Sequence, residues 1–400
     1  MIRLSFFCLY MLFAMEAAAQ TAAATFVRIA ESSSADTTIR IIITLDAPAA
    51  DANVSITPLR YNKRFACSFT LDDGLVSAAR VAFPFFNGGK VAPSFKDQWG
   101  FDQGADGAAH PGLFYTDGCG NPRPFTAAVA VNAHSVRKDS TPDAGNLSWG
   151  QLERMTSAGW DVLNHSFTHA TGKDVKAAEE VDSNTSAVQR HLHTSMRQFV
   201  IPGGKDDVLS LPLYTAAAFE QGLQVVHSSR YRDYWIEPAT CKDWDHLLAG
   251  RYFLHSNMKK DVFQEIAQRL ETGRYYWLNT FTHSVGNDNL WNISFRFNDF
   301  SAFFNRLAAA YGKDGADNMW FAPPEAVHAY ESLRRAVKPD ISYSDNKLLI
   351  TFDTNSLPAV EQHRALTFRV QGSAAIAEVS AENCTIESYG GKEKIINITW

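Results

Sequence analysis

Two short polar runs hold the side chains in this sequence that could do chemistry. Residues 69–74 read Phe-Thr-Leu-Asp-Asp-Gly, so two adjacent carboxylates, Asp72 and Asp73, end an apolar run. Residues 165–169 read His-Ser-Phe-Thr-His, which places two imidazoles four positions apart. Carboxylates and imidazoles bind divalent metals, and a carboxylate beside a ligand can serve as a base. Together the two runs indicate metal-assisted hydrolysis.

The elements that must position these residues are predicted from the pattern of apolar residues. From residue 65 onward short β-rich runs alternate with helical patterns, which indicates a parallel sheet with crossover helices. The predicted strands are 65–71, 126–131, 160–163, 198–201, 223–226, 275–281 and 318–321, and the predicted helices are 148–159, 174–196, 261–273 and 299–311. Since seven or eight such units can close on themselves, we expect an α/β fold with a distorted (β/α) barrel.

The chemical residues follow predicted strands of this barrel. Asp72 and Asp73 end the first strand, His165 the third, Pro202 the fourth, and His283 ends the strand 275–281. Parallel barrels build their active sites at the carboxyl ends of their strands. Each run also has a simpler interpretation, a turn after a strand for the carboxylates and a surface helix pair for the histidines. Their joint placement favours a metal site.

The sequence predicts four parts. The chain of 400 residues starts with a positive charge at Arg3, an apolar run and small residues, which is typical of a signal peptide over 1–19. A β segment over 20–60, the barrel over 61–335 and an all-β, sandwich-like domain over 336–400 would follow. We therefore expect an exported protein, periplasmic or secreted, with no transmembrane segment. The net charge of −6 offers no basic face for nucleic acid.

A long insertion interrupts the barrel at 84–124. It is rich in Gly, Asp and Pro and is far longer than an ordinary connection, so it is either a lid or a specialised insertion at the mouth of the site. Its aromatic residues could form a surface that stacks on sugars or a small core of their own, and they are Phe86, Trp99, Phe101, Phe114 and Tyr115. The C-terminal domain has a similar pair of interpretations, packing against the barrel or glycan binding, of which packing is favoured.

The motifs resemble those of the polysaccharide deacetylases with the NodB homology domain, carbohydrate esterase family 4. Residues 69–74 are similar to the family's T-F-D-D-G motif, with Leu71 in place of Phe, and residues 165–169 match its H-[ST]-x-x-H motif. The resemblance covers residues 65–329 with gaps. It implies an enzyme that hydrolyses N- or O-acetyl groups of a poly- or oligosaccharide.

The resemblance also implies roles for individual residues. Asp73, His165 and His169 would hold a divalent metal, usually Zn²⁺, with other coordination positions left for water and substrate. Asp72 would be the general base, and His283 would protonate the leaving amine or alkoxide. Pro202, Gly203 and Trp320 are further candidates for substrate contact, although core packing is the other interpretation of Trp320.

Two departures from the family pattern leave partners unassigned. The family's third motif carries an arginine that pairs with the catalytic aspartate, whereas this chain has Val200 before Ile201 and Pro202. Replacements for this arginine could come from Arg197, Lys205 or Arg230.

The group that orients His283 is also open, with Asp233 as a candidate, and His134 is an alternative acid. Two rival functions follow from these gaps: a non-catalytic glycan-binding relative that keeps the metal, and a metal-dependent amidohydrolase acting on a small non-sugar amide. Four cysteines outside the predicted signal peptide show no CxxC spacing and fix no pairing, and we expect Cys67 to be a buried free thiol.

Overall fold

The computed structural model describes residues 37–139, 145–204, 207–231, 233–290, 293–358, 360 and 362–400. The predicted signal peptide lies outside these residues, so the structure does not bear on it. Residues 39–400 form one compact unit. Within the described ranges, no helix has both the length and the apolar character needed to cross a bilayer. Cys67, Cys119, Cys241 and Cys384 are all free thiols, and Cys67 is buried as expected.

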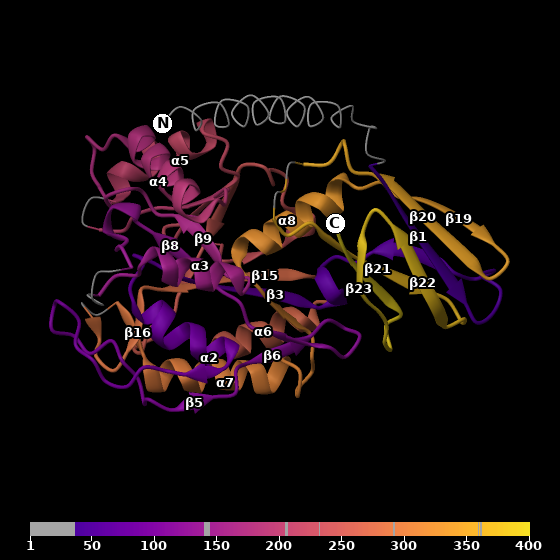
Figure 1. Ribbon diagram of the computed structural model, residues 1–400, viewed down its shortest axis with the longest axis horizontal. Coiled ribbons are helices and arrows are strands. Elements are labelled where there is room, and N and C mark those ends of the chain that lie inside the picture. Colours follow the sequence, from indigo (N-terminus) through magenta and orange to yellow (C-terminus); the bar gives the residue numbers. More distant parts are fainter. Residues whose placement is uncertain are drawn as a thin grey trace, which may run out of the picture. The chain divides into compact units, whose positions relative to one another are not determined.

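A nearly closed, mostly parallel sheet forms the centre of this unit (Figure 1). Its consecutive parallel strands are β3 (Phe65–Leu71), β8 (Ala128–Val131), β9 (Asp161–Asn164), β10 (Gln198–Val200), β11 (Val225–Ser228) and β13 (Leu247–Gly250). On the other edge of β3 lies β15 (Tyr276–Thr282), which also pairs with the antiparallel β12 (Trp235–Ile236). β18 (Met319–Phe321) pairs with the start of β3 on the same edge as β8. The predicted α/β fold with a distorted barrel is confirmed at this level.

The barrel closes through the continuation of β13. The chain leaves β13, passes through Arg251 and enters β14 (Tyr252–Phe253), which pairs in parallel with β15. The amide Nδ2 of Asn279 in β15 donates a hydrogen bond to the carbonyl of Gly250 at 3.0 Å. Arg251 therefore sits at the seam of the barrel, at the carboxyl end of β13.

Six longer helices accompany the strands: α3 (Trp149–Ser157), α4 (Ala177–Leu192), α5 (Asp207–Glu220), α6 (Val262–Glu271), α7 (Phe297–Tyr311) and α8 (Pro324–Ala336). Short 3₁₀ turns are η1 (Arg60–Asn62), η3 (Ala133–Ser135) and η4 (Pro238–Thr240). α3 begins with a capping box, because the Ser148 hydroxyl accepts from Gln151 N while the Gln151 side chain accepts from Ser148 N. Sequence analysis predicted α3, α4, α6 and α7 but not α5 or α8.

The insertion joins the main core rather than forming one of its own. It follows η2 (Ala78–Ala82) and contains α2 (Phe83–Asn87), β4 (Gly89–Lys90), β5 (Ala109–His110), β6 (Phe114–Thr116) and β7 (Pro122–Pro124). Phe86 is fully buried, with its ring centroid 6.0 Å from Phe69 of β3 and 4.8 Å from Phe304 of α7. Tyr115 is also buried, whereas Trp99 is 39% exposed. Packing is therefore the role of Phe86 and Tyr115.

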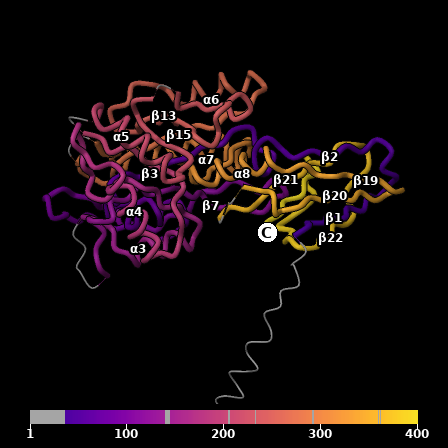
Figure 2. Tube along the Cα trace, turned by 90° about the horizontal axis from the view of Figure 1, so that it is seen from above, coloured from indigo at the N-terminus to yellow at the C-terminus, as the bar shows by residue number. Residues whose placement is uncertain are grey.

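Two four-stranded sheets combine the N-terminal strands with the C-terminal region (Figure 2). One has the order β19-β20-β1-β22 and the other the order β2-β21-β24-β23. The strands are β1 (Thr38–Leu45), β2 (Asn53–Ile56), β19 (Asp340–Ser344), β20 (Lys347–Asp353), β21 (Ala365–Gln371), β22 (Ile376–Glu382), β23 (Thr385–Gly390) and β24 (Ile395–Thr399). β1 pairs antiparallel with β22, and β2 with β21. A separate sandwich domain over 336–400 stays a prediction.

Candidate metal and catalytic site

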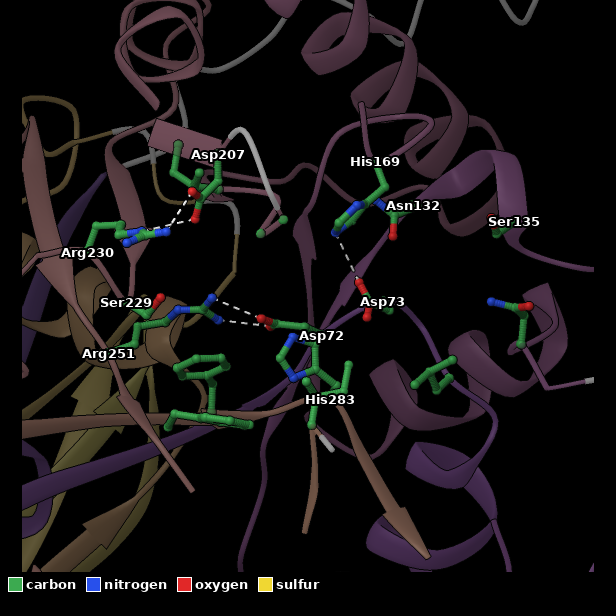
Figure 3. A pocket seen from close by; sticks show the side chains of 18 of the residues that line it. Asp72, Asp73, Asn132, Ser135, His169, Asp207, Ser229, Arg230, Arg251 and His283 are labelled. Carbon is green, nitrogen blue, oxygen red and sulfur yellow. Dashed lines mark hydrogen bonds and ion pairs between the residues drawn. The ribbon is translucent and has the colours of Figure 1, made fainter. Parts of the chain in front are cut away.

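A tight backbone turn after β3 separates the two adjacent carboxylates. Asp72 N donates to Thr282 O at 2.9 Å, which continues the pairing with β15 by one residue. The next two residues, Asp73 and Gly74, have φ of 70° and 61°. Left-handed conformation is unusual for aspartate and easy for glycine. The turn lets Asp72 face Arg251 while Asp73 faces His169, as Figure 3 shows.

The two motif histidines lie in a loop after β9, not on a helix. Ser166 and His169 both have left-handed backbone, with φ of 63° and 62°. The hydroxyl of Ser166 accepts from His169 N at 3.0 Å, which closes the loop. The interpretation as a surface helix pair is therefore wrong, because this local geometry turns both rings toward one point. The ring centroids of His165 and His169 are 4.9 Å apart.

Three buried asparagines hold this loop in place. Asn132, which follows β8, donates to the carbonyls of His165 and Ser166. Asn164 accepts from Ser166 N at 2.9 Å and from Asn184 of α4 at 2.9 Å. Sequence analysis did not select these residues, because single asparagines carry no spacing signal. Their buried hydrogen bonds fix the loop that presents the histidines.

Asp73, His165 and His169 converge on one point. The Nε2 atoms of both histidines each lie 3.3 Å from Asp73 Oδ1, and the possible ligand atoms all lie within 4.8 Å of one another. His165 Nδ1 lies 2.9 Å from Val200 O, at the end of β10. A hydrogen bond from Nδ1 to a carbonyl leaves Nε2 as the nitrogen with a free lone pair. The structure thus brings together all three residues that the resemblance implied as ligands.

The charges at this point favour a cation. Burial alone raises the pKa of the Asp73 carboxyl, but the nearby imidazoles of His165, His283 and His169 outweigh it, so the pKa lies well below its ordinary value. Burial lowers the pKa of His165, yet the Asp73 and Asp72 carboxylates raise it overall. Burial and the charge of His165 lower the pKa of His169. Two carboxylates and two imidazoles therefore meet at a point that suits a cation.

This donor set fits a divalent metal. Asp73 Oδ1 is buried and makes no hydrogen bond to any described residue, which is costly unless another group satisfies it. One carboxylate and two imidazoles are the ligands of many sites with open coordination positions, and Zn²⁺ accepts this set. Asp73, His165 and His169 are accordingly the residues that would hold the metal.

Asp72 is bound to a partner that sequence analysis missed. Arg251 NH1 donates to Asp72 Oδ1 at 2.8 Å and NH2 donates to Oδ2 at 2.9 Å, a bidentate pair. Both side chains are buried, with 2% and 3% exposure, and the guanidinium lies 4.0 Å from the ring centroid of Phe281. None of the proposed replacements occupies this place: Arg230 pairs with Asp207, Arg197 precedes β10 at the other end of the barrel, and Lys205 lies outside the described residues. Arg251 is the arginine that pairs with Asp72.

One cavity of about 640 Å³ connects these groups. Its lining includes Asp72, Asp73, His169, Arg251 and His283. The imidazole of His283 follows β15 and packs edge-on against Phe253 and Phe281, with centroids 5.5 and 5.7 Å away. Its Nδ1 is buried without a hydrogen-bond partner among the described residues. Two of the three possible ligands, Asp73 and His169, thus share a single cavity with the carboxylate–guanidinium pair and this histidine, while His165 is buried and outside the lining.

The remaining predicted residues differ in placement. Gly203 lines the cavity, while Pro202 is buried and lies outside the lining. Trp320 is 2% exposed and packs edge-on against Tyr330 at 5.6 Å, so its predicted contact with substrate is wrong and its ring belongs to the core. Asp233 accepts from Trp235 N at 3.1 Å instead of orienting His283.

His134 is exposed and packs edge-on against Phe167 with the ring centroids 5.5 Å apart. It does not line the cavity.

Comparison with known proteins finds similarity only among solved structures. No protein-family model matches the sequence, and no curated protein matches it. A deacetylase from Streptococcus pyogenes in complex with acetate is 15% identical, with a TM-score of 0.26, over 40% of this chain and 54% of the other. A family 4 acetyl xylan esterase from Clostridium thermocellum in complex with a cobalt ion is 15% identical, with a TM-score of 0.27, over 65% and 99%.

A polysaccharide deacetylase from Bacillus cereus is 14% identical, with a TM-score of 0.31, over half of each chain. The chain thus spans about half the length of the Streptococcus and Bacillus proteins. These identities and TM-scores are too low to establish a shared fold or activity. The functional argument therefore rests on the geometry of the site.

Proposed function

We propose that this protein is an exported, metal-dependent hydrolase that removes acetyl groups from a carbohydrate, either N-acetyl amides or O-acetyl esters of a poly- or oligosaccharide. One observation carries the proposal. Around a single cavity lie a metal-ligating triad, a carboxylate fixed by Arg251 and a histidine at the end of a neighbouring strand. These are the groups that hydrolysis of an acyl bond requires.

Each group has a part in the reaction. A divalent metal held by Asp73, His165 and His169, most simply Zn²⁺, would polarise the acetyl carbonyl and lower the pKa of water. Asp72 accepts the proton of the attacking water, and Arg251 holds both carboxylate oxygens in position.

His283 then donates a proton to the departing nitrogen or oxygen, because the tetrahedral intermediate collapses to products only when its leaving group is protonated. Its place in the cavity lining, beside both carboxylates, supports this role.

The position of Arg251 argues against the first rival function, a non-catalytic, glycan-binding protein. A non-catalytic, glycan-binding protein was suggested by the lack of an arginine before Pro202, and Arg251 supplies the bidentate partner from the seam of the barrel instead. The second rival, an amidohydrolase for small non-sugar amides, uses the same chemistry and is separated from the proposal by its substrate.

Acetate release tests the proposed activity. The purified protein should release acetate from acetylated chito- or xylo-oligosaccharides, lose this activity on treatment with a chelator, and regain it when Zn²⁺ is restored. The Asp73→Ala variant, which lacks one ligand, should show neither activity nor rescue. A protein that retains metal but releases no acetate from either series would favour the glycan-binding function. Turnover of small non-sugar amides alone would favour the amidohydrolase.

Export is proposed from the N-terminal sequence alone. The charged start, apolar run and small residues that end near Ala19 support cleavage at that point. N-terminal sequencing of protein recovered from the periplasm or medium should give a chain that begins close to Gln20. Recovery of the intact N-terminus from the cytoplasm would contradict export.

A further inference from the structure

Trp99 is the exposed aromatic residue of the insertion that lines the cavity. It lies in the same lining as Asp72, Asp73 and His283, and 39% of its surface is exposed. The buried aromatic residues of the insertion, Phe86 among them, serve the core, so Trp99 differs from them in lining the cavity that holds the candidate catalytic groups.

The turn that carries Trp99 is held by hydrogen bonds. Asp97 N donates to Phe101 O at 2.9 Å, and Asp97 Oδ1 accepts from Trp99 N at 2.8 Å and from Phe101 N at 3.0 Å. Gly100 at the tip has φ of 84°, a value that a non-glycine residue adopts only with strain. The Asp97 carboxylate is buried and also accepts from the side chain of Gln103. The indole is therefore presented by a defined turn.

The insertion is also tied to the loop that follows His283. Asp102 N donates to Asp288 Oδ2 at 2.9 Å, Asp288 N donates to Asp102 O at 3.0 Å, and Asn287 Nδ2 donates to Asp102 Oδ2 at 3.0 Å. Gly286 lies against the same segment, because a Cβ built there would be 2.7 Å from Asp102 O. These contacts fix the Trp99 turn relative to the catalytic histidine.

The indole rests on Gly145, in the loop that precedes α3. A Cβ built at Gly145 would be 2.8 Å from Cζ3 of Trp99, so the glycine backbone lies directly against the six-membered ring. Gly145 O accepts from Val76 N at 2.7 Å. Trp99 therefore contacts a segment that is hydrogen-bonded to Val76, three residues after Asp73. The indole lies at the rim of the site, not at the ligands themselves.

We propose that Trp99 is a stacking subsite for a pyranose ring next to the sugar whose acetyl group is removed, an inference that rests on the proposed function. One face of a pyranose presents C–H groups and its edge presents hydroxyls, so it binds an aromatic surface beside polar groups. The cavity of about 640 Å³ is larger than one acetylated monosaccharide requires. The substrate is accordingly an oligomer that extends from the metal site across Trp99.

Chain-length dependence of the kinetics tests this subsite. The probes are N-acetylchitooligosaccharides and acetylated xylo-oligosaccharides, each from a single unit to the hexamer, and 4-nitrophenyl acetate, which contains no pyranose ring. For the longer oligomers, Trp99→Ala should raise KM about tenfold, the size of one aromatic contact. The effect should grow with the length of the oligomer and be smallest for 4-nitrophenyl acetate, and the metal content should match that of the unsubstituted protein. Trp99→Phe should keep most of the affinity for oligomers.

A matched control and a binding measurement complete the test. Tyr343, 49% exposed on β19 and outside the cavity lining, provides the control variant Tyr343→Ala, which should leave every parameter unchanged. Binding of the hexamers, measured by calorimetry in an Asp72→Asn background, should weaken when Trp99→Ala is added. Acetate release with the same length dependence in Trp99→Ala, or equal hexamer binding, would overturn the subsite while the proposed function stands. Release from no oligosaccharide by the unsubstituted protein would overturn the proposed function itself.

Discussion

Asp72 and Asp73 are neighbours in sequence with separate partners, so their substitution should have separate effects. Asp72→Asn should keep the metal, because the three ligands are untouched, and should lower turnover by about 10²- to 10⁴-fold through loss of the base. Asp73→Ala should lose the metal as well as turnover. Metal content by mass spectrometry and acetate release measure the two effects. Equal metal loss in both variants would mean that the roles are reversed.

Asp72→Asn should also change stability, because Asp72 and Arg251 form a buried ion pair. Asp72→Asn leaves Arg251 buried without a counter-charge, which should lower the free energy of unfolding by about 3–5 kcal/mol. The double variant Asp72→Asn/Arg251→Met removes both charges and should recover part of this stability while turnover stays low. Denaturant unfolding of the three proteins provides the comparison.

His283 should matter most for a poor leaving group. His283→Ala should reduce release of acetate from an N-acetyl sugar by about 10²- to 10⁴-fold with normal metal content. The loss should be smaller for 4-nitrophenyl acetate, whose leaving group departs without a proton. An equal loss on both substrates would assign His283 a structural role.

At the residue scale, spacing in the sequence was sufficient for some groups and not for others. Asp73, His165 and His169 were predicted because two local motifs contain them. Arg251 was not, because it reaches Asp72 across 179 positions of sequence and follows a strand of four residues. Only the closed barrel brings these positions together. For Trp320 the sequence left both substrate contact and core packing open, since a strand-end tryptophan can point into the core or toward the site, and the structure places it in the core.

At the scale of elements, the link between the insertion and the loop after His283 predicts how the insertion responds to a single change. Asp288→Ala removes the acceptor for Asp102 N and should loosen the Trp99 turn. Residues 93–104 should then be cleaved faster in limited proteolysis, and KM for long oligosaccharides should rise.

Asp106→Ala is the matched control, because Asp106 is exposed and bonds only within the insertion among the contacts described, to Ala108 N and His110. Unchanged cleavage of Asp288→Ala would show that the anchor is unimportant.

Whole elements were predicted where their apolar pattern was long. β3 has the predicted bounds, because a run of seven successive buried residues can be interpreted only as a strand. β12 and β14 have two residues each and are too short for any period to be detected. α5 was missed since Pro212 interrupts its helical pattern. The pairing of β1 and β2 with C-terminal strands is set by tertiary contacts that no local pattern encodes.

At the scale of the whole molecule, a buried acidic cluster joins the barrel to the C-terminal sheets. His363, which precedes β21, lies 2.9 Å from Asp161 at the start of β9. Burial lowers the pKa of His363, but the Asp161 charge raises it overall. Burial and the Asp161 charge raise the pKa of Glu325, in the first turn of α8, to about 8.

Both shifts predict that stability falls as pH rises. The folded protein binds the His363 proton more tightly than the unfolded chain, so this contribution is present below about pH 6.5 and lost above the raised pKa. Unfolding releases the Glu325 proton between the ordinary pKa of 4.5 and about 8, which favours the unfolded chain over that range. The free energy of unfolding should therefore decrease as the pH rises from 4.5 to about 8.

Glu325→Gln should flatten this dependence, whereas the exposed Glu153→Gln on α3 should not. Denaturant unfolding at several pH values measures it. An equal dependence of the free energy of unfolding on pH in both variants would contradict the role of the Asp161, Glu325 and His363 cluster. A free energy of unfolding that rises with pH would contradict it as well.

The seam of the barrel has a consequence for how the molecule would lose activity on warming. β14 meets β15 through only two residue pairs, whereas β3 meets β15 through seven. Short pairings open first in local fluctuations, and Arg251 is the residue that immediately precedes β14. A transient opening there would release the guanidinium from Asp72 while the metal ligands, which lie on β3 and β9 loops, stay together. Amide hydrogens of 252–254 should exchange with solvent faster than those of 65–71, and catalysis should fade at temperatures where the protein is still folded and still holds its metal.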